Sequence, residues 1–113
     1  MAPGEICLAW FPFGDVPGMK LRPVLLLTEP IGPTPEVVAA YITSVVPNSL
    51  VATDIVLDPK RPEDAATNLK VVSVLRLHKI ASIHCASVVR TLGRLSPSVQ
   101  VEVSTRLRSM LRL

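Results

Sequence analysis

The stretch from residue 4 to residue 27 constrains the fold most, because it contains two strands and the long connection between them. Apolar residues alternate over 6–11 with the period of two that is typical of a β-strand. Prolines and glycines at 12–18 then predict an exposed loop. The chain returns to a strand through Arg22-Pro23, and proline forces the preceding residue into extended geometry. Arg22 is therefore expected where a loop meets a buried strand, a place from which a guanidinium can contact a phosphate.

The remaining sequence is predicted to be mostly β. Strands are expected over residues 24–28, 37–46, 54–57, 70–77 and 88–95, with 78–83 either continuing the fourth of these or turning away and 85–87 making one helical turn. Proline-bearing residues 29–35 and polar residues 58–68 are expected to be loops. Short strands separated by long loops indicate a small, twisted, partly closed β-barrel.

One helix is predicted at the C-terminal end. Ser96 suits the N-cap and Pro97 the first helical position. An apolar stripe follows at helical spacing, formed by Val99, Val103, Leu107, Met110 and Leu111. Strands and helix together are expected to form a single domain over residues 1–113.

Composition limits the class of protein. Apolar residues make up 49% of the chain, and a mean hydropathy of +0.44 is high for a small monomer, which favours an apolar interface between two copies. No uninterrupted apolar run exceeds six residues, far short of the roughly 20 that span a bilayer. The first ten residues do not resemble a signal peptide. A cytoplasmic protein that does not enter a membrane is expected.

Charge is divided unevenly along the chain. Residues 1–64 have a net charge of −4 and residues 65–113 a net charge of +7. This asymmetry has two interpretations of about equal weight. One is a cationic face that binds nucleic acid or an acidic protein tail, and the other is a solvated helix face.

Neither a metal nor a nucleotide cofactor is predicted. His84 and Cys85 are consecutive strand residues that point to opposite faces, and no second cysteine pair joins them and His78. No phosphate-cradling glycine motif is present. Cys7 and Cys85 lie far apart in the sequence and are expected to be free thiols.

Four blocks of the sequence resemble, in order, the motifs of the MazF/PemK family, toxins of bacterial toxin–antitoxin pairs that cut RNA. They are residues 4–27, the segment 40–44 that ends in Ile-Thr-Ser, residues 74–83 and residues 92–97. The resemblance covers nearly the whole chain. It implies an SH3-like barrel with a C-terminal α-helix, a homodimer, single-stranded RNA (mRNA) as substrate, cleavage without a metal, and a cognate antitoxin whose disordered tail occupies the RNA groove.

Cleavage of this kind needs few protein groups. The 2′-hydroxyl of RNA attacks the neighbouring phosphate, so the protein must move two protons and stabilise the charge that develops. The resemblance places the catalytic arginine of the family at Arg22 and its catalytic threonine at Thr43. A guanidinium suits the phosphate because its planar fork matches two oxygens. The alternative for Arg22 is a structural salt bridge to Glu5 or Asp15, and for Thr43 it is ordinary strand propensity.

A second pair of catalytic candidates lies in the third block. Arg76 matches an arginine that some family members use as an acid or a phosphate ligand. His78 stands where those members carry an aspartate, and histidine titrates near neutral pH, so it would serve as base or acid. The alternative for His78 is a polar strand-end residue that hydrogen-bonds a neighbour.

Contacts to RNA are assigned to Phe13, Lys20, Ser44 and Lys79. Phe13 lies past the end of the first strand and is expected to stack on a base. Trp10 shares a face with apolar residues of that strand and is expected in the core.

Two other functions remain open on the same fold. CcdB-like inhibitors of DNA gyrase use aromatic and apolar residues at the end of the C-terminal helix, whereas this chain ends in residues 110–113 without an aromatic residue. A catalytically degenerate member that binds only nucleic acid or its antitoxin is the other alternative, which His78 allows. Arg22 and Thr43 favour the ribonuclease.

Overall fold

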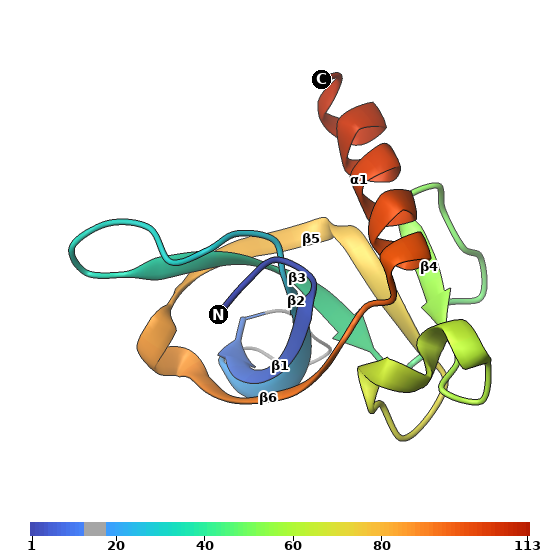
Figure 1. Cartoon of the computed structure of the whole chain (residues 1–113), viewed down its shortest axis with the longest axis horizontal. Helices are drawn as coiled ribbons and strands as arrows, with labels where there is room; N and C mark the ends of the chain where they lie inside the picture. Colours follow the sequence, from blue (N-terminus) through green and yellow to red (C-terminus); the bar gives the residue numbers. More distant parts are fainter. Residues whose placement is uncertain (13–17) are drawn as a thin grey trace.

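The computed structural model describes residues 1–12 and 18–113. Its elements, in chain order, are β1 (Glu5–Phe11), β2 (Lys20–Leu26), β3 (Glu36–Thr43), β4 (Asp54–Leu57), the 3₁₀ segment η1 (Pro62–Thr67), β5 (Ser73–His84), the 3₁₀ turn η2 (Cys85–Ser87), β6 (Val88–Arg94) and α1 (Pro97–Leu111). The strands form one six-stranded antiparallel sheet in the order β4-β5-β3-β2-β1-β6 (Figure 1).

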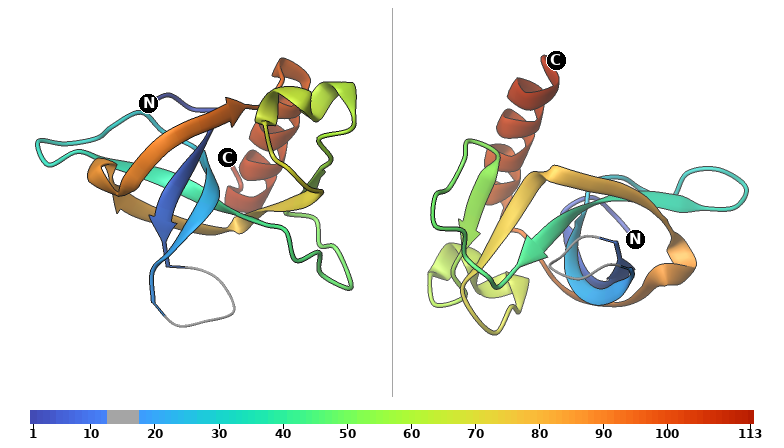
Figure 2. Two further views of the ribbon diagram at one scale, coloured as in Figure 1. Left: turned by 90° about the horizontal axis from the view of Figure 1, so that it is seen from below. Right: turned by 180° about the vertical axis from the view of Figure 1, so that it is seen from behind.

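The sheet curls strongly but does not close, because β4 and β6 remain at its two edges. Both views in Figure 2 show η1, β4 and α1 gathered at one end of the molecule, opposite the loop between β2 and β3. The prediction of a mostly β, barrel-like fold with one C-terminal helix is confirmed.

Apolar residues pack on both faces of the sheet. The cluster inside the curl consists of Cys7, Ala9, Phe11, Val24, Leu26, Val37, Ala39, Tyr41 and Ile83. The cluster on the other face includes Ile6, Leu25, Ile42 and Leu75, and it is covered by Val99 and Val103 of α1. Burial raises the pKa of the Cys7 thiol, so this side chain stays neutral and packs as a small apolar residue.

Trp10 corrects the core prediction. Its side chain is 46% exposed, and Leu21, its partner on β2, is 41% exposed. Ile6 lies on the same strand and is fully buried beneath the cluster that α1 covers. Alternation along β1 fixed which residues share a face, but α1 covers only one end of that face.

The helix begins as predicted. Pro97 is its first residue, and the side chain of Ser96 accepts a hydrogen bond from the N–H of Val99 at 3.4 Å. Val99 and Val103 of the predicted stripe are buried, whereas Leu111 is exposed. Figure 1 shows the reason, since the C-terminal half of α1 extends beyond the sheet.

Several boundaries differ from the sequence prediction. β2 runs from Lys20 to Leu26 instead of 24–28, so Arg22 lies inside the strand and not where a loop meets it. β3 ends at Thr43 instead of residue 46, and β5 begins at Ser73 instead of residue 70 and runs on to His84. The predicted loop 58–68 contains η1, which is held by the buried carboxylate of Asp64. That carboxylate accepts the N–H of Asp58 at 3.0 Å. A Cβ at Gly93 would collide with the backbone of η1, so this segment lies directly on β6.

Candidate functional site

The site is built where β2 and β3 separate. Within the described residues their ladder has three pairs and ends at Val24 and Tyr41. Beyond that point β2 stays beside β1 back to Lys20, while β3 stays beside β5 to Thr43. The two strands therefore form a fork that opens toward the C-terminal end of β3.

Pro23 explains where the fork begins. The N–H of Leu27 donates to the carbonyl of Val38 at 2.8 Å. In an antiparallel ladder every second residue bonds the same neighbour, so the backbone groups of Pro23 also face β3. Proline has no N–H, and it cannot continue the ladder toward Ile42. The Arg22-Pro23 dipeptide thus opens the sheet as well as fixing the geometry of Arg22.

A groove of about 450 Å³ lies at the mouth of this fork. Arg22 lines it from β2, and Thr43 and Ser44 line it from the end of β3. Its apolar lining includes Leu8, Pro23, Ile42, Leu69 and Leu92.

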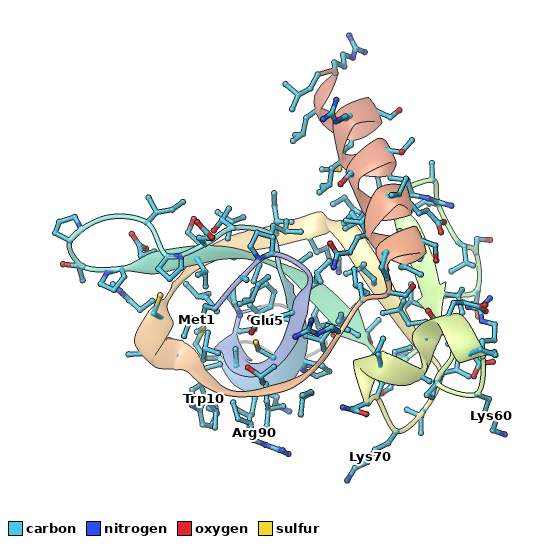
Figure 3. The ribbon with its side chains drawn as sticks, viewed as in Figure 1. Met1, Glu5, Trp10, Lys60, Lys70 and Arg90 are labelled. Carbon is cyan, nitrogen blue, oxygen red and sulfur yellow. The ribbon has the colours of Figure 1, made fainter. Side chains whose placement is uncertain are left out.

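The charge of the groove is positive. Arg22, Lys70 and Arg90 line it, and no carboxylate is found among the described lining residues. In the view of Figure 3 the side chains of Lys70 and Arg90 project from the same side of the molecule. An apolar floor with a cationic rim fits an occupant that has flat apolar parts and negative charge, which is the chemistry of a single-stranded nucleic acid.

Arg22 is held at the fork by Tyr41. Its Nη1 donates to the Tyr41 hydroxyl at 3.4 Å, and its Cζ lies 5.6 Å from the centre of the Tyr41 ring. Its Nε is buried and has no hydrogen-bond partner among the described residues. A buried donor without an acceptor costs roughly 1–3 kcal/mol, so this atom favours a ligand oxygen.

The alternative salt bridge of Arg22 to Glu5 is not formed. The carboxylate of Glu5 accepts from the Thr91 hydroxyl at 3.3 Å instead. The ion pairs of the described residues involve Arg61, Arg76 and Arg106 only. The other proposed partner, Asp15, lies outside the described residues.

Thr43 lies at the tip of the other strand of the fork. Its hydroxyl oxygen accepts the N–H of Val45 at 3.1 Å, which ends β3 and holds the side chain in place. The register of β2 and β3, extended past Pro23, would set Arg22 opposite Thr43, so the two side chains belong to one face. Ser44 follows Thr43 along the groove.

Arg76 does not line this groove. Its Nε lies 2.9 Å and its Nη2 3.4 Å from the two carboxylate oxygens of Asp54. The Asp54 side chain is fully buried, and that of Arg76 is 20% exposed. This two-point ion pair joins β5 to the start of β4 and gives Arg76 a structural partner.

His78 lies on a bulge of β5. Ala40 pairs with Ile80 and Tyr41 with Arg76, so residues 77–79 have no partner on β3 and strict strand alternation is interrupted there. The exposed His78 ring places Nδ1 2.6 Å from the Thr53 hydroxyl.

The segment that holds both residues is itself fastened to the C-terminal helix. Arg106 of α1 donates through Nη1 to the carbonyls of Ala52 and Asp54 at 2.7 and 3.1 Å. Thr53 and Asp54, which contact His78 and Arg76, are therefore positioned by α1.

The four predicted RNA contacts lie in different places. Ser44 lines the groove, and Lys20 is exposed at the start of β2. Lys79 places its Nζ 5.8 Å from the centre of the Tyr41 ring. Phe13 lies outside the described residues.

Family membership is decided by a match over almost the whole chain. The model of the PemK-like, MazF-like toxins of type II toxin–antitoxin systems matches residues 2–111. The chain belongs to this family. Among solved structures the toxin is similar to the Mycobacterium tuberculosis toxin MazF-mt6, with a TM-score of 0.73 and 25% identity over 96% of this chain and 97% of that one.

Two further solved structures share the fold of this toxin. One is a mycobacterial endoribonuclease in complex with its cognate antitoxin, with a TM-score of 0.69 and 17% identity over 100% of this chain and 96% of that one. The other is a mycobacterial endoribonuclease, with a TM-score of 0.67 and 16% identity over 100% and 92% of the two chains. No curated protein sequence matches the toxin.

In the described part of the chain, no group of three or more His, Cys, Asp or Glu side chains could hold a metal ion. No helix there is long and apolar enough to cross a membrane.

Sequence reasoning missed three residues of the site. Lys70 and Arg90 line the groove, and their only signal was the positive charge of residues 65–113. Tyr41 lies within an apolar run, and the sequence therefore indicated only an ordinary strand residue there. Its contact with Arg22 depends on the pairing of two strands that are distant in sequence.

Proposed function

We propose that this toxin is a sequence-selective endoribonuclease that cleaves single-stranded RNA, chiefly mRNA, without a metal ion. The observation that carries the proposal is the buried Arg22 Nε, which has no acceptor among the described residues and lies in a positively charged groove whose described lining has no carboxylate. Membership of the toxin family and the likeness to mycobacterial endoribonucleases support it.

The substrate supplies the nucleophile. Its 2′-hydroxyl loses a proton and attacks the adjacent phosphorus, and the bond to the 5′-oxygen breaks as that oxygen gains a proton. The products are a 2′,3′-cyclic phosphate and a 5′-hydroxyl. Arg22 donates from Nε and a terminal nitrogen to the phosphate oxygens, on which negative charge increases in the transition state. Thr43 donates a hydrogen bond from its hydroxyl to the same phosphate, from the opposite strand of the fork.

Proton transfer is assigned to His78, which Thr53 holds through Nδ1 and which therefore presents Nε2. The proposed catalytic role of Arg76 stays a prediction, because Asp54 already occupies its guanidinium. The other groove cations, Lys70 and Arg90, contact the RNA backbone, and Ser44, Lys20 and Lys79 add to them.

The homodimer follows from the high apolar content of the chain, and the antitoxin partner follows from the charge of the groove. A homodimer and a cognate antitoxin are part of the proposal, and one similar endoribonuclease was solved with its cognate antitoxin. An acidic antitoxin segment would compete with RNA for the cationic groove. Its affinity should fall at high salt through screening.

The test is cleavage of a long single-stranded RNA by the purified toxin in excess EDTA. We expect cuts at a short motif, with a 2′,3′-cyclic or 3′-phosphate on one fragment and a 5′-hydroxyl on the other. Activity that disappears with the chelator and returns with magnesium would refute the mechanism. Tight RNA binding without any cleavage would identify a degenerate member that only binds.

A further inference from the structure

We propose that Tyr41 is a positioning residue that joins Arg22 and Lys79 into a two-cation site for neighbouring phosphates of one RNA strand. The inference rests on the proposed function, because it takes RNA as the ligand. It assigns a task to an aromatic residue that the cleavage chemistry itself does not require.

Tyr41 is fixed before any ligand arrives. It forms the last pair of the β2–β3 ladder, directly at the base of the fork. Its side chain is only 5% exposed. The Phe11 ring stacks on it with centroids 6.3 Å apart and an angle of 10° between the planes. A ring packed in this way offers a rigid surface to the groups that lie over it.

Two cations from different strands lie over this one ring. The Cζ of Arg22 is 5.6 Å and the Nζ of Lys79 is 5.8 Å from its centroid. Both distances are within the roughly 6 Å over which a cation is attracted to an aromatic face. Arg22 comes from β2 and Lys79 from β5, so Tyr41 on β3 connects the two neighbouring strands.

The bulge of β5 explains how Lys79 reaches the ring. Residues 77–79 are extra relative to β3, since the pairing moves from Ala40 with Ile80 to Tyr41 with Arg76. Lys79 is thereby released from the regular register and placed over the residue that ends the β2–β3 ladder. A regular strand would have no such extra residue at this point.

Neither cation is paired with a carboxylate in the part of the chain that the structure describes. The ion pairs of the described residues include neither Arg22 nor Lys79. Two like charges held over one ring repel each other unless negative charge is added. A nucleic-acid strand supplies one negative charge at each phosphate, and it would satisfy the buried Arg22 Nε at the same time.

The ring contributes more than the hydroxyl. The hydrogen bond from Arg22 to the Tyr41 hydroxyl is 3.4 Å long, beyond the usual range for a strong bond. Tyr41→Phe keeps the ring and should therefore lower the cleavage rate only about two- to fivefold. Tyr41→Leu removes the ring, which lets Arg22 move, and should lower kcat about ten- to 100-fold.

Binding is measured with a 2′-deoxy oligonucleotide, which cannot be cleaved because it lacks the nucleophile. The affinity falls as salt rises, and the slope of log K against log salt reports how many phosphates the protein neutralises. On a single strand each neutralised phosphate contributes about 0.7 to the size of this slope. Lys79→Gln should lower this slope by about 0.7. The matched control is Lys60→Gln, an exposed lysine that Figure 3 shows at the far edge of the molecule, and its slope should equal that of the parent.

A readout independent of activity is the resonance of the Arg22 Nε–H. Ring current from Tyr41 should shift it in the parent and in Tyr41→Phe, and the shift should be lost in Tyr41→Leu. If Tyr41→Leu does not fold, Tyr41→Met serves instead, because its flexible side chain fills the space more easily.

The outcomes separate the two proposals. A parent protein that binds the oligonucleotide but never cuts RNA refutes the nuclease and leaves the two-cation site standing. A Lys79→Gln slope equal to that of Lys60→Gln refutes the two-cation site. An aliphatic Tyr41 variant that keeps the parent rate and the parent Arg22 resonance shows that Tyr41 does not position the arginine.

Discussion

Arg22 and Arg76 lie on the two strands that flank β3, yet the surroundings of their guanidinium groups differ. The guanidinium of Arg76 is matched by both oxygens of the buried Asp54. Arg22 contacts an aromatic ring and forms one long hydrogen bond, and among the described residues it has no carboxylate partner and its Nε has no acceptor. An arginine with an internal counter-ion stabilises the fold, whereas an arginine without one has binding capacity left for a ligand.

The largest effect is expected from Arg22→Ala. Loss of one donor to a developing oxyanion typically lowers the rate by roughly 10²- to 10³-fold, or about 3–4 kcal/mol. Circular dichroism should be unchanged, because the side chain forms no ion pair among the described residues. Arg22→Lys should recover little, since an ammonium does not offer two parallel donors. Cleavage at the parent rate by folded Arg22→Ala would show that the site is wrongly assigned.

Arg76→Ala is the matched substitution on the other side of β3. It leaves the fully buried Asp54 carboxylate without its partner. Removing one member of a buried ion pair costs about 3–5 kcal/mol of unfolding free energy, and the partial exposure of Arg76 places this pair near the lower value. Urea denaturation measures the loss. Cleavage per folded molecule should fall less than tenfold, and a loss as large as that of Arg22→Ala would give Arg76 the catalytic role that the sequence predicted.

Pro23→Val tests the fork itself. The new N–H can donate to β3 and extend the ladder, so the groove should narrow and cleavage should fall about tenfold through misplacement of the catalytic groups. Stability should change by no more than about 1 kcal/mol, the value of one hydrogen bond. Hydrogen exchange at residue 23 reports whether the bond forms. The control is Pro30→Val in the exposed β2–β3 loop, which should cleave like the parent.

The smallest effect is expected from His78→Ala. A general acid or base in direct contact with the substrate contributes roughly 10²- to 10⁴-fold. The His78 ring is exposed and is not among the described lining residues of the groove, so we expect it to move protons at a distance and its removal to lower the rate only about two- to tenfold. Thr53→Val removes the partner of Nδ1 and keeps the imidazole. An equal loss in both variants would show that orientation of the ring matters, and no loss in either would remove His78 from the mechanism.

The sequence predicted those parts of the structure that are determined by residues close together in the chain. The Ser96 cap and the turn at 85–87 follow from local backbone preferences and lie where expected. Arg22-Pro23 is extended as expected, but it lies within β2 and not at the junction of a loop and a strand. Features that depend on distant segments were not accessible. Trp10 is exposed because α1 does not cover its end of β1, and the pairing of Arg76 with Asp54 joins residues that no local pattern connects.

The candidate site was predicted only in part, again because some of its contacts join segments that are distant in the sequence. Arg22 and Thr43 line one groove, although their sequence neighbourhoods share no periodicity. The role of Tyr41 was hidden because its contacts come from β1, β2 and β5 together. Proline at residue 23 was understood as a restraint on Arg22, while its effect on the ladder became visible only with the strand register.

The short β2–β3 ladder has a thermodynamic consequence. Its three pairs are the fewest between any two neighbouring strands of the described chain, and past Val24 and Tyr41 no ladder pairs join these two strands. A ligand that touches Arg22 on one side and Thr43 on the other ties the two halves of the sheet together. Such a ligand raises the unfolding free energy by RT ln(1 + [L]/Kd). Amide protection should therefore increase along these two strands, and the melting temperature of the toxin becomes a direct measure of groove occupancy.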